Sequence, residues 1–542
     1  MPRSEASSLL GDYHRIGGAA TPRGGSSYGS SDAATPRSPF DTGFPMMFNS
    51  PVPSPRPHRL SFAFAAKDDS SHNRHVFLSL LVSVVGVGLL AVPYTFILTP
   101  SWAAVLGVVL VGFSMAFTAT ALLNTHVALS QDQEVVYHIG AGKRFTSFQS
   151  IAVLAGGNHF GYLVSIVTAV GIYGGCVGSI RIIRDISPFL LIELQVLLTK
   201  SETKLSTTES LQWADLFLCG TLLVVVFPLC LLKNLSGLRM SSYFGFAFSI
   251  YVVLAVIYRS SHALDVTSAA LISDDSDDSA NAGPTNSTGE LIDSLAAALS
   301  AIVKDSGARA MEKTAETVIV GGPLSRFAQS LSIYSYAFML HLNLLPLFIQ
   351  LRGSFAEPLQ KSRRKMSDYI LGVTVVCIFL YLVLGLFAKK LFGKTTRGNV
   401  LLNLESDPIM EVPLVAVYLT AIAGFPLLFH PLRSVLEELI YSTTISEIPF
   451  STRLGGTSFL LLSQLILAIV VPGIEVVFAF TGATSCVLIC FLFPAVMYTQ
   501  LFPWRTARGG KLWVAALWVL VGVFSVVGGI ATWFLVIDMR RH

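Results

Sequence analysis

The sequence predicts an all-α, polytopic membrane protein with eleven transmembrane helices. Its 542 residues are 52% hydrophobic and only 13% charged, whereas a soluble domain carries about 25% charged residues. The mean hydropathy is +0.64, and uncharged runs of about 20 residues, each long enough to cross a bilayer, recur along the chain. These observations exclude an ordinary soluble protein. The net charge of +4 decides little, because in membrane proteins the position of charge matters more than its sum.

Residues 1–72 differ in composition from the rest of the chain. They are rich in Ser, Gly, Pro and Ala, which predicts a disordered cytoplasmic tail, and they lack the apolar core of a signal peptide. Five Ser-Pro or Thr-Pro pairs have two interpretations, phosphorylation sites or plain low-complexity sequence. Glu5–Leu10 is similar to an acidic dileucine sorting signal. It favours a vacuolar or lysosomal membrane slightly over the plasma membrane.

Eleven apolar runs follow the tail, with turn signals such as Thr99-Pro100 and Pro472-Gly473 between them. They cover residues 76–97, 101–125, 159–193, 211–232, 241–259, 327–350, 368–388, 411–430, 455–472, 474–499 and 512–537. The six cysteines lie mostly inside these runs without metal-ligand spacing, so we expect buried thiols and no disulfide framework.

Lys and Arg are concentrated in alternate short loops, as in Lys361–Lys365, which predicts a cytoplasmic N-terminus. Lys389, Lys390, Lys394 and Arg397 depart from this rule, because they lie in a predicted outer loop. Residues 260–326 form a polar insertion on the same outer side, extracellular or luminal. It contains Asn286 in an Asn-Ser-Thr sequon, a glycosylation acceptor that is meaningful only on that side.

The first run contains a predicted break. Gly86 and Gly88 are followed by Pro93 within the apolar stretch Val82–Phe96. Glycine costs about 1 kcal/mol and proline about 3 kcal/mol relative to alanine inside a helix. Broken backbone at membrane depth is tolerated where it lines a cavity, and half-helices of this kind form the binding sites of secondary transporters. The alternative is that the glycines serve close helix packing.

The sixth run contains a second predicted break. Its stretch Ser332–Pro346 places Tyr334, Tyr336, His341 and Asn343 before a proline. Polar side chains inside a membrane usually face the bundle interior or a cavity. Interruptions at corresponding positions of two halves indicate an inverted-repeat transporter. His341 is either a hydrogen-bonded interior histidine or a proton-binding group, and the two tyrosines either pack with satisfied hydroxyls or line a pathway.

Several segments resemble the amino acid/auxin permease family, which includes sodium-coupled neutral and proton-assisted amino acid transporters. The resemblance is carried, in chain order, by Ser83–Phe96, Phe227–Phe246, Tyr336–Leu351, Phe425–Leu439 and Val471–Ala495. It implies a LeuT-like fold with two inverted repeats of five spans, at residues 73–259 and 327–500, and an eleventh span with the C-terminus at 501–542. It also implies a substrate pocket between broken spans one and six, closed by spans three, eight and ten.

Physical chemistry supports such a pocket for an α-amino acid. The N-terminus of a half-helix offers free N–H groups to the carboxylate, while unwound carbonyls and hydroxyls accept the ammonium group. The residues expected to line the pocket are Gly86, Val87, Gly88, Tyr336, Ala337, Phe338, Tyr173, Thr420 and Gly424. Near the outer end of span three, Arg181 and Arg184 share a helix face. They are expected to reach the interface or to pair with Asp185 or Glu475, and the alternative is a charged gate or a contact with an anionic substrate.

The predicted function is secondary active transport of amino acids, without a cofactor or bound metal and without covalent chemistry, so the protein is not expected to be an enzyme. In the family's sodium-coupled members an asparagine of span one supplies an oxygen ligand, but Val82 stands at that position here. We therefore expect proton coupling, with His341 as the candidate group because its reference pKa is about 6.5. The alternatives are a sodium-coupled symporter and an amino acid sensor that signals through its N-terminal tail.

Overall fold

The computed structural model describes residues 69–137, 148–199, 207–232, 239–274, 322–352, 358–405, 408–441 and 449–540. Within these ranges, ten helices are long and apolar enough to cross a membrane. There are eleven if His75–Val84 and Gly88–Leu98, which are bent by 41° at a short break, count as one span. Each predicted apolar run corresponds to one of these spans. The prediction of an all-helical, multi-pass protein is confirmed.

The first half of the chain contains five spans. Its elements are α1 (Asp69–Val84), η1 (Val87–Ala91), α2 (Val92–Leu98), α3 (Ser101–Tyr137), α4 (Phe148–Thr199), α5 (Thr207–Thr221), η2 (Leu222–Val226), α6 (Phe227–Leu231) and α7 (Arg239–Asp274). Helix α1 begins within the predicted tail, and α7 continues beyond residue 260 into the predicted polar insertion. Most of the tail, the insertion around Asn286 and the dileucine-like segment lie outside the described residues.

The second half contains six spans. Its elements are α10 (Pro323–Ala337), α11 (His341–Arg352), α12 (Leu359–Phe392), η4 (Gly393–Thr395), η5 (Val400–Asn403), η6 (Pro408–Met410), α13 (Glu411–Tyr441), α14 (Phe450–Val470), α15 (Ile474–Thr481), η7 (Gly482–Cys486), η8 (Leu488–Leu492), α16 (Phe493–Leu501) and α17 (Gly510–Met539). The span that runs from α15 to α16 contains two π-helical turns, η7 and η8.

Helix α4 is longer than the third predicted run and is kinked near its start. Gly157 has φ of 76°, a left-handed conformation that glycine adopts without a Cβ penalty. The polar residues Asn158 and His159, which interrupt the sequence pattern, follow this kink directly. The helical segment therefore begins eleven residues earlier than predicted, at Phe148 rather than at residue 159.

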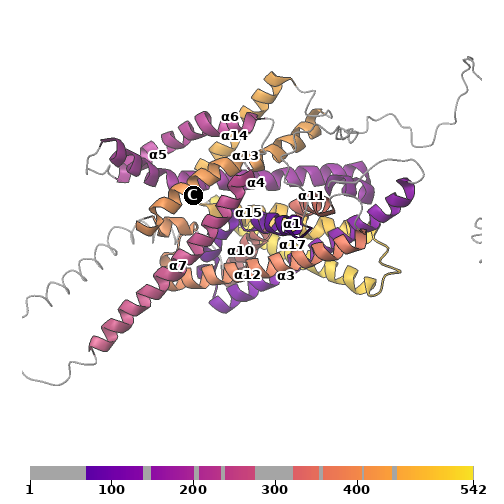
Figure 1. The fold of residues 1–542 in the computed structure, drawn as a ribbon, viewed down its shortest axis with the longest axis horizontal. Coiled ribbons are helices and arrows are strands. Elements are labelled where there is room, and N and C mark those ends of the chain that lie inside the picture. Colours follow the sequence, from indigo (N-terminus) through magenta and orange to yellow (C-terminus); the bar gives the residue numbers. More distant parts are fainter. Residues whose placement is uncertain are drawn as a thin grey trace, which may run out of the picture. The chain divides into compact units, whose positions relative to one another are not determined.

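Long helices pack side by side around an apolar core. Helix α12 packs against α3, and α13 packs against both α4 and α7; Figure 1 shows α3 and α12 running together. Large apolar side chains such as Leu223 of η2, Phe379 of α12 and Phe459 of α14 are exposed. An outward-facing apolar surface is expected where lipid rather than water is the solvent. All six cysteines lie in the described residues and are free thiols.

The structure accounts for two cations that violate the predicted charge rule. Lys389 Nζ donates to Phe96 O at 2.6 Å and reaches Thr99 O at 3.5 Å, so it caps the C-terminal end of α2. Arg397 pairs with Glu405 at 3.5 Å. A cation next to helix-end carbonyls is locally stabilised by the helix dipole. These two side chains therefore have structural partners, which gives them a reason to lie in this loop that is independent of membrane orientation.

Candidate functional site

The break in the first span consists of two residues, Val85 and Gly86, between α1 and η1. Helix α1 ends at Val84, and Gly86 adopts an extended conformation with φ of −111° and ψ of −150° before η1 begins. Gly86 is exposed, and a Cβ added there would meet no atom within 4 Å. The first N–H groups of η1 lack partners within that helix, as at any helix start. The backbone at Gly86 is thus open to an approaching group.

The break in the sixth span lies between α10 and α11. Helix α10 ends at Ala337, and the chain is not helical again until His341. Phe338 N donates to Tyr334 O at 2.9 Å and Met339 N donates to Tyr336 O at 3.2 Å, so the last carbonyls of α10 are partly satisfied by this turn. The polar residues that mark the sequence pattern therefore surround a real interruption of the helix.

The two breaks lie against each other. A Cβ added to Gly88 would lie 2.9 Å from Ala337 Cα, so the two backbones approach more closely than any larger residue allows. The hydroxyl of Thr95, on α2, hydrogen-bonds to that of Tyr334, on α10, at 2.6 Å. Of the two interpretations of the glycines, close packing describes Gly88, whereas Gly86 faces open space.

Tyr381 of α12 joins the ends of both broken helices. Its hydroxyl donates to Ala337 O at 2.9 Å and to Val84 O at 3.3 Å, and the side chain is fully buried. The ring of Phe338 packs edge-on against it, with centroids 4.8 Å apart. Tyr381 is not among the site residues predicted from the sequence. A signal was present, because a hydroxyl in the middle of the apolar run 368–388 is the kind of intramembrane polar group that marks an interior contact.

The other predicted lining residues occupy several helix interfaces. Tyr336 stacks on Phe478 of α15, with centroids 4.3 Å apart and an interplanar angle of 11°. Tyr173 donates from its hydroxyl to Ser463 Oγ of α14 at 3.0 Å. Thr420 lies beside Gly245 of α7. Gly424 is half-buried with open space next to its Cα. The pocket function of these residues stays a prediction.

His341 is fully buried at the first position of α11. Its Nε2 lies 3.0 Å from Thr118 Oγ1 on α3. The Thr118 hydroxyl is also within hydrogen-bond distance of Ser114 O and Met115 O, at 3.1 and 3.2 Å. If its single proton goes to one of these carbonyls, His341 Nε2–H donates to Thr118 and Nδ1 keeps a free lone pair. Among the described residues Nδ1 has no hydrogen-bond partner.

Charged residues of α4 form a network at the predicted outer end. Arg181 pairs with Asp185 at 3.1 Å, one of the partners that the sequence predicts. Arg184 instead pairs with Asp215 of α5 at 2.6 Å. Both arginines also donate to carbonyls near the C-terminus of α14, Arg181 to Pro472 O at 2.7 Å and Arg184 to Ile469 O at 3.2 Å. These ion pairs and hydrogen bonds therefore link α4 to α5 and to the C-terminal end of α14.

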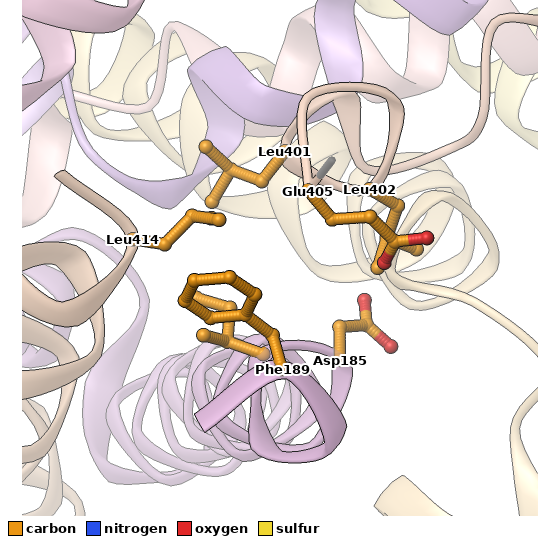
Figure 2. A pocket seen from close by; sticks show the side chains of 7 residues that line it. Asp185, Phe189, Leu401, Leu402, Glu405 and Leu414 are labelled. Atoms are coloured by element: carbon orange, nitrogen blue, oxygen red, sulfur yellow. The ribbon is translucent and has the colours of Figure 1, made fainter. Parts of the chain in front are cut away.

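The same end contains a small cavity of about 10 Å³, which is about the room that one water molecule needs. Figure 2 shows the carboxyl groups of Asp185 and Glu405 at one side of it, with Phe189 and Leu414 on the other. Asn399 donates from Nδ2 to Asp185 Oδ2 at 3.1 Å, which attaches the segment around η5 to α4. Burial raises the pKa of the Glu405 carboxyl; Arg397 opposes this shift and Asp185 adds to it.

One protein family matches most of this chain, and individual known proteins match part of it. Residues 69–535 match the family described as transmembrane amino acid transporter protein. Solute carrier family 38 member 10 of Mus musculus is 28% identical over 204 residues, which are 36% of this chain and 17% of that protein. Sodium-coupled neutral amino acid transporter 4 of Homo sapiens is 27% identical over 221 residues, 40% of this chain and 38% of that protein.

A plant protein is similar to the same degree. Amino acid transporter AVT6C of Arabidopsis thaliana is 29% identical over 220 residues, which are 39% of this chain and 48% of that protein. The chain thus matches between 17% and 48% of the length of these three relatives. The family match is far longer than the pairwise ones and includes both broken spans. By that match, the chain belongs to the family of transmembrane amino acid transporter proteins.

Proposed function

We propose that this protein moves amino acids across a membrane by alternating access, with a substrate pocket at the two breaks. The observation that carries the proposal is the contact between Gly88 and Ala337, which brings the interruptions of spans one and six together. Paired broken helices at mid-membrane are typical of secondary transporters with inverted repeats. We assign the repeats to residues 73–259 and 327–500, with α17 as an additional span.

Within this pocket we assign the substrate carboxylate to the start of η1. Gly86 is exposed with open space beside it, and the first N–H groups of a helix together with its positive dipole end attract an anion. Tyr336, Ala337 and Phe338 form the opposite side. The backbone contacts hold the zwitterion common to all amino acids. The shape of the surrounding side chains, with Tyr173, Thr420 and Gly424 as further wall positions, selects the substrate.

We propose the proton as the coupling ion. Val82 has no side-chain oxygen, and the nearby hydroxyls of Ser83 and Thr420 donate within their own helices, to Leu80 O at 2.8 Å and Val417 O at 2.9 Å. Dehydrating a sodium ion for too few oxygen ligands is costly. His341 Nδ1, in contrast, has a lone pair without a hydrogen-bond partner among the described residues, directly after the break in span six.

Sodium coupling is the specific alternative, because one of the relatives is a sodium-coupled neutral amino acid transporter. Uptake by the full chain in proteoliposomes, measured with a panel of labelled amino acids, distinguishes proton coupling from sodium coupling. We expect an inward-acidic pH gradient to drive accumulation of at least one amino acid, and replacing sodium by choline at fixed pH to leave it unchanged. Collapse of uptake in choline with no response to pH would contradict proton coupling, and no exchange of any amino acid would contradict the transport proposal itself.

A pair of histidine variants tests the coupling group. His341→Gln should keep exchange of labelled for unlabelled amino acid but lose accumulation driven by the pH gradient. The matched control is His126→Gln on α3, because His126 is also buried, at 6% exposure, but contacts Phe348 away from the break. It should retain gradient-driven uptake. Equal behaviour of the two variants would remove His341 from the proposed mechanism.

A further inference from the structure

Two helix C-termini converge at the centre of this protein. Helix α1 ends at Val84 and helix α10 ends at Ala337, and the last carbonyls of any helix lack partners within it. Each C-terminus also carries the negative end of the helix dipole, equivalent to about half an elementary charge. Bringing two such ends together in an apolar environment is unfavourable unless a positive group lies between them.

The group that lies between them is the hydroxyl of Tyr381. It is 2.9 Å from Ala337 O and 3.3 Å from Val84 O, so one phenolic proton is shared by two carbonyls. Val84 O additionally accepts from Gly86 N at 2.8 Å. The tyrosine is fully buried and held by the ring of Phe338. Its position is therefore determined by packing as well as by the two hydrogen bonds.

Converging half-helix C-termini and unwound carbonyls are also the environment in which secondary transporters bind a small cation. The carbonyl oxygens at the ends of α1 and α10 would suit such an ion chemically, because they are hard oxygen ligands with negative dipole ends behind them. In this protein the Tyr381 proton already occupies the position between them.

We propose that the Tyr381 hydroxyl takes the place of a monovalent cation between the carbonyls of Val84 and Ala337, because its proton offsets the negative ends of both helices. It bridges the two half-helix ends through a neutral donor, so the chain needs no sodium ion at this place. The inference rests on the proposed function and sharpens it, because it gives a structural reason for independence from sodium. It also predicts a latent cation site when the hydroxyl is removed and the ring is kept. In that site the carbonyls of Val84 and Ala337 supply two oxygen ligands, and water that enters the space of the lost hydroxyl supplies the others.

The variant that tests this is Tyr381→Phe in the full chain, purified in detergent. We expect the wild-type protein to have the same Tm in sodium, lithium and choline chloride at equal ionic strength. Tyr381→Phe should melt several degrees lower in choline chloride, because both carbonyls lose their donor. It should regain most of that loss in sodium chloride, with a saturable dependence on concentration.

The matched control is Tyr334→Phe. Tyr334 is an equally buried phenol at the same break, but its hydroxyl bonds to the Thr95 side chain instead of to helix-end carbonyls. It should lose stability to the same extent in every salt. A Tyr381→Phe variant that is as stable as wild type in choline, or that is destabilised equally in all salts, would overturn the proposal.

A second variant covers the case in which Tyr381→Phe does not fold. Tyr381→Asn removes the ring and adds an amide oxygen, which is a further ligand for a cation. Folded Tyr381→Asn protein with a saturable sodium-dependent Tm supports the proposal, whereas equal stability in all salts, or failure of both variants to fold even in sodium, overturns it. Because melting requires no transport, these outcomes are independent of whether the amino acid uptake experiment succeeds.

Discussion

Helix ends near the two ends of the bundle are capped by charged side chains, whereas those at the central breaks are capped by a neutral one. Arg433 Nη1 donates to Cys230 O at 2.8 Å near the end of α6, and Lys389 Nζ donates to Phe96 O near the end of α2. At the centre, Tyr381 performs the same task with a phenol. An isolated charge costs more the deeper it lies in the membrane. In the sequence, Arg433 and Lys389 lie next to predicted loops, whereas Tyr381 lies in the middle of an apolar run.

The two charged ends also differ from each other. At the predicted cytoplasmic end, the Arg433 and Glu437 side chains are 4% and 9% exposed, with Nε and Oε1 3.6 Å apart. At the predicted outer end, the Arg184 and Asp215 side chains are 24% and 42% exposed. Solvent screens the Arg184–Asp215 pair, whereas the Arg433–Glu437 pair is buried and is screened little. Removing one partner should therefore have unequal consequences at the two ends.

The largest effect on transport is expected at the central break itself, from Gly88→Val. A valine Cβ would lie 2.9 Å from Ala337 Cα, so the two half-helices would have to separate. Overpacking of a close contact typically costs about 1–3 kcal/mol, and the displacement would also disturb the proposed pocket. We expect amino acid uptake to be abolished and Tm to fall, measured on protein that reaches the membrane.

Gly86→Ala is the matched control, two residues earlier. A Cβ there meets no atom within 4 Å, and φ of −111° suits an alanine. Its Tm should match wild type within experimental error. Normal transport by Gly88→Val, or equal losses of stability in both variants, would show that the close contact between Gly88 and Ala337 is not required.

The next effect, on stability rather than on transport, should come from Arg433→Gln. Breaking a buried ion pair costs about 3–5 kcal/mol where the remaining charge is left without compensation. Here the remaining charge belongs to Glu437, and Arg453 also acts on it electrostatically, so we expect a loss of stability at the lower end of that range. Arg184→Gln should cost less, about 1 kcal/mol, because solvent screens this partly exposed pair, although Arg184 makes two hydrogen bonds to Asp215. Thermal melting of the two variants measures both losses of stability, and we expect the loss from Arg433→Gln to be the larger. The double variant Arg433→Gln, Glu437→Gln should be more stable than Arg433→Gln alone, and equal losses at both ends would contradict the comparison.

The positions of both breaks could be predicted from sequence, because glycine, proline and polar residues are costly inside an apolar helix and therefore mark where it is interrupted. The pairing of Arg181 with Asp185 could be predicted as well, since both lie on one helix four residues apart. The hydrogen bonds from Tyr381 to Val84 and Ala337 could not, because they join residues 297 and 44 positions apart. Only the folded arrangement decides which carbonyls a hydroxyl reaches.

The positive-inside rule failed at Lys389 for a related reason. The rule treats each cation as solvated beside the membrane, but Lys389 is engaged with carbonyls of α2. The same reasoning explains why Gly86 and Gly88 seemed equivalent in sequence. In the structure Gly86 is extended and faces open space, whereas Gly88 lies in η1 against the backbone of α10.

The smallest effect concerns pH and the outer end, through Glu405→Gln. Burial raises the pKa of Glu405 above its ordinary value of 4.5, with Arg397 opposing and Asp185 adding to the shift. A raised pKa means that the folded protein binds the proton more tightly than the unfolded chain does. This contribution to stability is complete below pH 4.5 and is lost as the pH rises through the raised value. The wild type should therefore lose Tm relative to Glu405→Gln as the pH rises from below 4.5 to neutrality. The difference should be small, because the Glu405 side chain is 41% exposed and solvent screens it.

Two further variants, in chains that retain Glu405, test the causes of the shift. Arg397→Gln should extend the pH range of the stability loss to higher pH, because the cation that opposes the raised pKa of Glu405 is gone. Asp185→Asn should shorten that range, because an anion that adds to the raised pKa is gone. A Tm difference that does not change with pH in any of these chains would show that Glu405 does not titrate differently in the folded protein.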